Sequence, residues 1–140
     1  MQNTQKKHIK NFTDWNTQKQ HIETHWKHKR VKAGQVWWSK LGVNVCREQD
    51  GGKDFRRPVV ILKRINYMLA LVIPLTSQVK NPTSPFYFRL KSDDKNSICL
   101  LLQIRVISTK RLVREKWTLP REELVKLIGA VTKFFFSNHV

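Results

Sequence analysis

The sequence contains few cysteines, and this excludes a disulfide-based scaffold. Only two occur, Cys46 and Cys99, and no Cys-x-x-Cys motif is present. Small secreted domains that depend on disulfides carry more cysteines than this. A chain of 140 residues is also long enough to bury a core without disulfides. We therefore expect two reduced cysteines in a cytoplasmic protein.

Long hydrophobic runs are absent as well. The longest apolar run, residues 68–75, is far too short to span a bilayer. The N-terminus is charged but no hydrophobic stretch follows it, so we expect no signal peptide. Internal repeats and low-complexity tracts are also missing. These absences predict one domain, with an appendage and no membrane partner.

Acidic residues are scarce beside basic ones. The chain has 10 Asp and Glu against 27 Lys and Arg, which gives a formal net charge of +17 at pH 7. Such an excess favours a polyanionic partner, either a nucleic acid or an acidic protein. A solvated basic surface is the alternative. An anionic membrane surface is less favoured, because no basic amphipathic helix with a wide apolar face is present.

Residues 1–32 form a distinct basic segment. The pattern over residues 11–28 predicts a helix, because apolar residues recur at helical spacing. These residues are Phe12, Trp15, Ile22 and Trp26. We expect this face to dock on the main domain or on another chain.

The same helix lacks the zinc-protease motif, although HIETH at residues 21–25 resembles it. That motif needs Glu directly after the first His, and Glu23 comes one position late. His21, His25 and His28 could share a metal ion on one helix face. A row of solvated or phosphate-facing histidines is the favoured interpretation.

The periodicity changes to that of short strands after Gly34. We predict strands at residues 35–39, 57–65, 67–75, 86–90, 97–102 and 111–119, with residues 103–110 as a connection. Asn66 and its neighbours link the second and third of these tightly, so we expect the two to pair as an antiparallel hairpin. Pro120 opens a final helix whose predicted buried face holds Leu124, Leu127, Ile128, Val131 and Phe135. Many short strands with one closing helix predict a small, strongly bent antiparallel sheet or barrel.

Several aromatic residues allow two interpretations. Trp37, Trp38, Phe86 and Phe88 could fill the core or stack on nucleobases, and the core is favoured for most of them. Residues 134–136 are three consecutive phenylalanines, which cover more than one helix face. This terminal cluster suggests a dimer contact.

The loop at residues 48–58, EQDGGKDFRRP, is the strongest candidate site. Its two glycines allow a tight turn or a close approach to a ligand. Pro58 favours an extended Arg57 at the root of a strand. The planar guanidinium of an arginine so placed pairs well with phosphate. Alternatively, Arg57 could pair with Glu48 or Asp54 on the surface.

Four segments together resemble the PemK/MazF family of toxin endoribonucleases. They are GQVWWSKLG at residues 34–42, EQDGGKDFRRPVVIL at 48–62, VIPLTS at 72–77 and SICLLLQIRVISTKRL at 97–112. Their order and spacing make the resemblance specific, and it extends from residue 34 to about residue 135.

The resemblance implies a mainly β fold with helices (α+β): a small SH3-like antiparallel barrel with a C-terminal helix and here an extra N-terminal helix. The chain then divides into a basic helical extension (1–32) and a PemK/MazF-like toxin domain (33–140). The implied function is that of a homodimeric toxin of a type II toxin–antitoxin system, neutralised by a cognate antitoxin. Its implied activity is metal-independent, sequence-specific cleavage of single-stranded RNA (an mRNA interferase), without a cofactor.

The resemblance also assigns site residues one by one. The family's catalytic arginine matches Arg57, its catalytic threonine Thr76, and its loop acid Glu48. Gln103 matches the glutamine that orients the ribose or phosphate. Arg57 is expected to stabilise charge, and Glu48 is the candidate base. The expected RNA-binding residues are Gln49, Lys53, Arg56, Ser77 and Arg105, and no residue is expected to bind a metal.

The sequence departs from the family pattern at two positions. Leu102 stands where many members have an acid, and Cys46 stands where a glycine is common. The missing acid keeps an alternative open, a catalytically inactive module of the same fold that binds RNA, DNA or antitoxin. A gyrase poison of the same fold is a third possibility, which the Arg-Pro and Gln-Ile-Arg segments disfavour.

Overall fold

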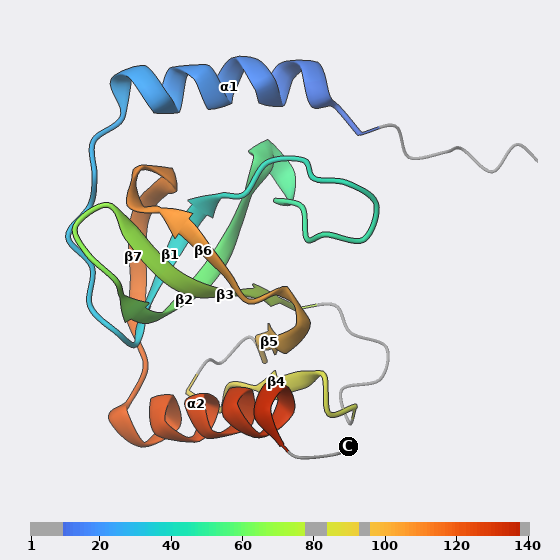
Figure 1. Cartoon of the computed structure of the whole chain (residues 1–140), viewed down its shortest axis with the longest axis vertical. Coiled ribbons are helices and arrows are strands. Elements are labelled where there is room, and N and C mark those ends of the chain that lie inside the picture. Colours follow the sequence, from blue (N-terminus) through green and yellow to red (C-terminus); the bar gives the residue numbers. More distant parts are fainter. Residues whose placement is uncertain (1–9, 78–83, 93–95, 138–140) are drawn as a thin grey trace, which may run out of the picture.

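The computed structural model describes residues 10–77, 84–92 and 96–137, and in this part of the chain an antiparallel sheet lies between two helices (Figure 1). The elements are α1 (Phe12–His25), β1 (Gln35–Lys40), η1 (Lys53–Phe55), β2 (Arg56–Arg64), β3 (Leu69–Thr76), β4 (Tyr87–Arg89), β5 (Ile98–Leu100), η2 (Leu101–Gln103), β6 (Arg105–Ser108), η3 (Thr109–Arg111), β7 (Leu112–Thr118) and α2 (Arg121–Phe136). The predicted mainly β fold with an N-terminal and a C-terminal helix is confirmed.

The strand order is β4-β5-β3-β2-β1-β7, and β6 also pairs with β3. One end of β3, residues 69–72, pairs with β6, while Leu75 and Thr76 at the other end pair with β5. Since one strand serves two partners in succession, the sheet bends around β3 (Figure 1). The predicted small and bent antiparallel sheet is therefore present.

The predicted hairpin between β2 and β3 is also confirmed. The two strands pair antiparallel, with Ile61 opposite Val72. The Asn66 side chain closes the turn, because its oxygen accepts hydrogen bonds from the backbone N–H groups of Met68 (2.8 Å) and Leu69 (2.9 Å). An asparagine that bonds its own backbone two or three residues ahead favours such a turn.

The prediction of a plain connection at residues 103–110 is wrong. This segment contains the strand β6. The strand predicted at residues 97–102 is shorter than expected, because the 3-10 helix η2 replaces its C-terminal end. β6 pairs with the start of β3, with Val106 opposite Leu71. A four-residue strand has too little local signal to be recognised, since it forms only where a distant strand offers hydrogen bonds.

Alternate residues of β2 enter two hydrophobic clusters. Val60 and Leu62 pack with α2, while Val59 and Ile61 pack in the second cluster. The buried face of α2 is rotated from the predicted one. Leu127 and Val131 are buried and Leu124 and Phe134 pack beside them, whereas Ile128 and Phe135, predicted as buried, are exposed.

Helix α1 docks on its own domain, which is one of the two predicted alternatives. The Asn11 side chain caps it by accepting a hydrogen bond from the Asp14 N–H (3.1 Å). Trp15 and Ile22 are buried as predicted, but Phe12 is 51% exposed. The helix ends at His25, so His28 does not extend the histidine row.

His28 instead fastens the segment that follows α1. Its Nδ1 lies 2.9 Å from the hydroxyl of Thr109, which is fully buried. The same hydroxyl accepts the Lys29 N–H (3.3 Å) and donates to the carbonyl of Tyr67 (3.0 Å). The connection between α1 and β1 is therefore tied to η3 by a buried hydrogen-bond centre.

Candidate functional site

A groove of about 780 Å³ opens where the N-terminal end of β2 meets the C-terminal end of β3. Among the described lining residues, the cationic side chains come from η1, β2 and β7, and Asp54 supplies the single carboxylate. That carboxylate forms an ion pair with Lys40 (3.0 Å). The net charge of the lining is thus positive, which suits an anionic ligand. The lining residues are Trp38, Gly52, Lys53, Asp54, Arg56, Arg57, Pro58, Leu75, Thr76, Ser77, Ser97 and Lys116.

Arg57 is held in this groove by backbone carbonyl groups. Its Nε donates to Asp50 O (2.8 Å) and its Nη1 to Leu75 O (3.2 Å). Among the residues that the structure describes, no carboxylate forms an ion pair with it. Burial lowers the pKa of the guanidinium, and the Asp50 charge opposes that shift. The surface pairing with Glu48 or Asp54, considered from the sequence, is not observed.

The backbone before Arg57 makes a tight turn. A Cβ atom on Gly51 would lie 2.0 Å from the carbonyl oxygen of Phe55, so no larger residue fits there. Asp54 and Phe55 both have a φ of +58°, a conformation that such residues seldom adopt. The glycine predicted to allow a tight turn does so, and the turn delivers Arg57 to the root of β2.

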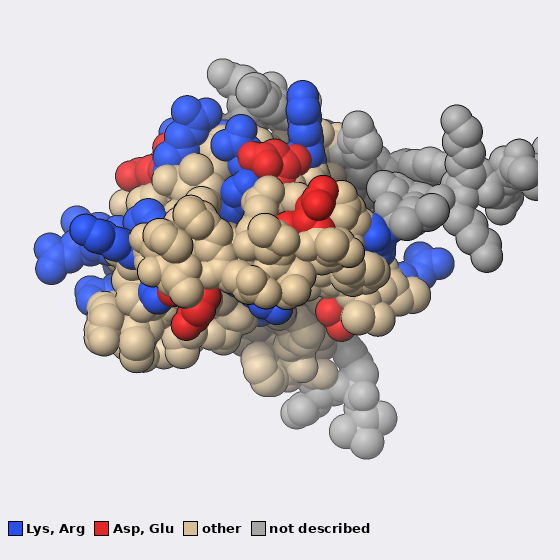
Figure 2. All heavy atoms as spheres, turned by 90° about the horizontal axis from the view of Figure 1, so that it is seen from above, with Lys and Arg blue, Asp and Glu red and all other residues tan. Residues whose placement is uncertain are grey.

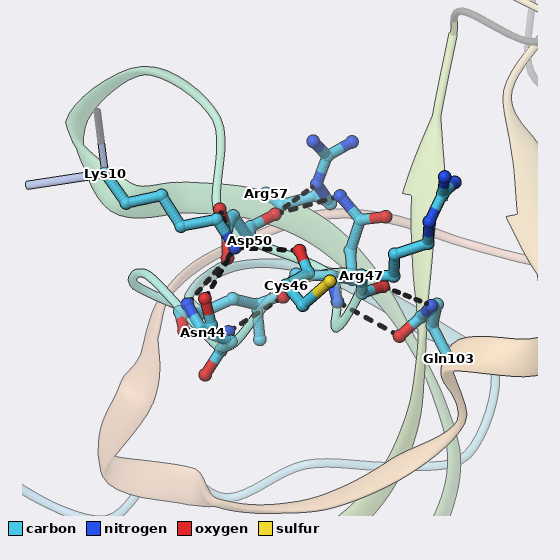
Figure 3. Close-up of polar contacts among 9 residues, drawn as sticks. Lys10, Asn44, Cys46, Arg47, Asp50, Arg57 and Gln103 are labelled. Atoms are coloured by element: carbon cyan, nitrogen blue, oxygen red, sulfur yellow. Dashed lines mark hydrogen bonds and ion pairs between the residues drawn. The ribbon is translucent and has the colours of Figure 1, made fainter. Parts of the chain in front are cut away.

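Gln103 lies beside the same loop, but it does not line the groove. Its Oε1 accepts the Gln49 N–H (3.0 Å), and its Nε2 donates to Arg47 O (3.1 Å) (Figure 3). The amide of Gln103 therefore holds the backbone of residues 47–49. Gln49 contributes a backbone N–H to this contact, and its side chain bonds Asp50 O (3.0 Å).

The structure brings some of the predicted site residues together and separates others. Lys53, Arg56, Arg57, Thr76 and Ser77 share the groove. The other predicted residues, Glu48, Gln49, Gln103 and Arg105, lie outside its lining. Glu48 is exposed in the loop, and Arg105 lies on β6 opposite Val72.

Trp38 and Lys116 were missed as site residues. The Lys116 Nζ lies 4.5 Å from the centroid of the Trp38 ring, and the Arg56 guanidinium lies 5.4 Å from it. Two cations within cation–π distance of one indole ring place that ring in the most basic part of the groove. Trp38 had been considered as a possible base-stacking residue, but Lys116 carried no distinguishing sequence signal. It reaches the groove only because β7 pairs with β1.

The outward face of α1 does not form a comparable basic surface. Figure 2 looks down on this end of the molecule and shows Lys and Arg mainly towards its edges, around an uncharged centre. Within α1, Lys19 is accompanied by the acidic residues Asp14 and Glu23. No residue of α1 lines the groove around Arg57.

In the described residues, no group of three or more His, Cys, Asp and Glu side chains is placed to hold a metal ion. His21 and His25 stack with their ring centroids 4.3 Å apart, without a third ligand beside them. No helix among the described residues is long and apolar enough to cross a membrane.

Comparison with known families gives a match over most of the chain. The model of a family described as PemK-like, MazF-like toxin of type II toxin-antitoxin system matches residues 32–135. No curated protein sequence matches the chain.

The fold is similar to that of several solved structures. MazF (Form-I) from Deinococcus radiodurans has 23% identity and a TM-score of 0.62, covering 76% of this chain and 96% of that one. MazE–MazF (Form-II) from the same organism has 19% identity and a TM-score of 0.58, covering 79% and 99%. An endoribonuclease in complex with its cognate antitoxin, from a mycobacterial species, has 15% identity and a TM-score of 0.60, covering 79% and 100%.

Proposed function

The chain belongs to the PemK-like, MazF-like family of toxins of type II toxin–antitoxin systems, and on that premise we propose that it is a metal-independent endoribonuclease of single-stranded RNA. The observation that carries the proposal is the position of Arg57. It lies in a basic groove with Thr76 and Ser77, and carbonyl groups rather than a carboxylate hold it.

The proposed reaction uses the RNA's own 2′-hydroxyl as nucleophile. The 2′-oxygen attacks phosphorus, the bond to the 5′-oxygen breaks, and the products carry a 2′,3′-cyclic phosphate and a 5′-hydroxyl. Negative charge increases on the phosphate oxygens in the transition state, where fixed donors stabilise it most. Arg57 supplies positive charge there, and the hydroxyl groups of Thr76 and Ser77 donate to phosphate oxygens.

The proposed reaction also needs an acid and a base for its proton transfers. Burial lowers the pKa of Arg57, which is the direction that favours proton donation, but a guanidinium remains a poor acid. Its main proposed role is therefore electrostatic, and water supplies the proton that the departing 5′-oxygen takes up. Asp54 supplies the carboxylate among the described lining residues, but the Lys40 hydrogen bond and charge lower its pKa and weaken it as a base. Glu48, exposed in the loop, stays the proposed base.

The proposed partners follow from the same family membership. One similar structure is a complex with its cognate antitoxin, and we extend that kind of partner to this chain. We also propose a homodimer in the cytoplasm. Exposed apolar side chains on α2, at Ile128, Phe135 and Phe136, support a contact with a second copy.

The test is incubation of the purified protein with a long single-stranded RNA in EDTA. We expect discrete fragments with 2′,3′-cyclic phosphate ends. Arg57→Ala should reduce the rate about 100-fold or more. Arg64→Ala is the matched control, because Arg64 is an exposed arginine at the far end of β2. Intact RNA bound by a folded wild-type protein would refute the nuclease and favour the inactive binding module.

A further inference from the structure

Lys10, just before α1, fastens the loop that precedes Arg57. Its ammonium group donates to the carbonyl oxygens of Asn44 (2.5 Å) and Cys46 (2.9 Å). It also forms an ion pair with the Asp50 carboxylate (3.3 Å). One cation therefore joins both ends of the loop segment 44–50.

Asp50 connects Lys10 to Arg57, because it contacts both residues. Its carboxylate accepts the Asn44 N–H (2.6 Å), which closes the segment on itself. Its carbonyl oxygen accepts the Arg57 Nε–H (2.8 Å). Figure 3 shows the Lys10 side chain reaching Asp50 from one side while Arg57 meets Asp50 from the other. The orientation of the guanidinium thus depends on where Asp50 is held.

The packing of helix α1 on the domain fixes the position of Lys10, which precedes it. Trp15 is 5% exposed and packs so closely on Gly42 that a Cβ atom there would lie 1.8 Å from its ring. Its ring centroid is 5.6 Å from that of Phe55. Farther along the helix, Gln18 Oε1 accepts a hydrogen bond from Lys40 Nζ (3.1 Å). The helix is therefore attached at both ends of the loop that runs from β1 to β2.

These contacts hold the loop without closing the groove. The groove around Arg57 keeps a volume of about 780 Å³, and no residue of α1 contributes to its lining. An N-terminal helix that covered the RNA site would line or fill this space. The geometry therefore favours a supporting role for α1 over an autoinhibitory one.

We propose that Lys10 is a positioning residue for RNA cleavage, which holds Asp50 so that Arg57 presents its remaining N–H groups to the scissile phosphate. This inference rests on the proposed function. Because Lys10 acts through Asp50 and does not line the groove, its loss should lower kcat more than it raises KM. Small misplacements of a group that acts in the transition state are costly.

The test compares Lys10→Met with Lys19→Met in the full chain, with RNA cleavage in EDTA as the first readout. Lys19 is an exposed lysine of α1, so its replacement removes the same charge without touching the loop. We expect Lys10→Met to lower kcat about 10-fold with little change in KM. Lys10→Arg, which keeps the charge, should recover most of the rate, and Lys19→Met should match the wild type.

The second readout, hydrogen exchange of the Asn44 and Gln49 amides, does not require cleavage. Both should exchange faster in Lys10→Met and at the wild-type rate in Lys19→Met. Unchanged exchange and kcat would overturn the inference. So would a faster Lys10→Met enzyme, or a rise in KM alone. Faster exchange when no protein cuts RNA would support the contact with the loop and overturn the proposed function instead.

Discussion

The guanidinium of Arg57 donates a 2.8 Å hydrogen bond to the carbonyl oxygen of Asp50, seven positions earlier in the chain. This bond ties the root of β2 to the preceding loop. A carbonyl oxygen orients the guanidinium without neutralising it, whereas a paired carboxylate would offset its charge. Arg57 therefore keeps its positive charge available for a phosphate, while the carbonyl groups fix the orientation of its guanidinium.

Gln103→Ala should loosen the loop from the side opposite Lys10. It removes two hydrogen bonds to the loop backbone, at Gln49 N and Arg47 O. We expect the free energy of unfolding to fall by about 1 kcal/mol, and the Gln49 amide to exchange faster. Urea denaturation and hydrogen exchange measure both effects. Gln20→Ala, at an exposed glutamine of α1, is the control, and equal effects from the two variants would contradict this prediction.

Gly42→Ala should detach Trp15 from the domain. Gly42 has a φ of +74°, and its new methyl group would overlap the Trp15 ring. We expect a loss of about 2–4 kcal/mol in stability from backbone strain and lost packing, with a shift in tryptophan fluorescence. Gly129→Ala is the contrasting variant. No atom lies within 4 Å of a Cβ placed there, so this helix substitution should stabilise by about 0.5–1 kcal/mol.

Trp38→Ala should weaken RNA binding. Its ring lines the basic groove, where stacking of one base on an aromatic ring contributes about 1–3 kcal/mol. We expect the Kd for a 2′-O-methyl RNA, which cannot be cut by this route, to rise about 10-fold in fluorescence anisotropy. Trp26→Ala is the control, since Trp26 also lies beside a lysine but outside the groove. Similar Kd values for wild type and Trp38→Ala would count against this role.

The Asp54–Lys40 ion pair should make a small contribution to stability that depends on pH. The Lys40 hydrogen bond and charge lower the pKa of Asp54 from its ordinary value of 3.8. A lowered folded-state pKa contributes stability above the unfolded pKa, and that stability is lost as the pH falls through the folded value.

Asp54→Asn should accordingly be less stable than the wild type at pH 6. The difference should stay below about 1 kcal/mol, because the carboxylate is half exposed. It should shrink as the pH falls below about 4. Denaturation at several pH values measures it, and a difference that persists in acid would show that Asp54 acts through packing rather than charge.

Much of the fold was predictable from local patterns. The β2–β3 hairpin followed from two apolar runs around Asn66, whose side chain does close the turn. The helix α2 followed from Pro120 and a helical apolar repeat. The four-residue strand β6 and the rotated face of α2 were not predictable in the same way, because both depend on which distant residues they meet.

The candidate site also contains residues that the sequence indicates and residues that it does not. Arg57 stood out because glycines, charges and Pro58 are its neighbours in the sequence. Trp38 and Lys116 lie in different strands, and they meet only because β1 is placed between β2 and β7. The contact from Lys10 to Asp50 joins residues 40 positions apart.

The sequence by itself determined the basic charge, the strand and helix preferences, and an arginine at the root of a strand. These properties depend on residue type and on neighbours along the chain. Only the tertiary structure decided which face of α2 is buried, which side chains share the groove, and how Lys10 reaches the loop. Such contacts form between segments far apart in sequence. They are selected by the burial of apolar surface and by strand pairing, and local backbone preferences do not specify them.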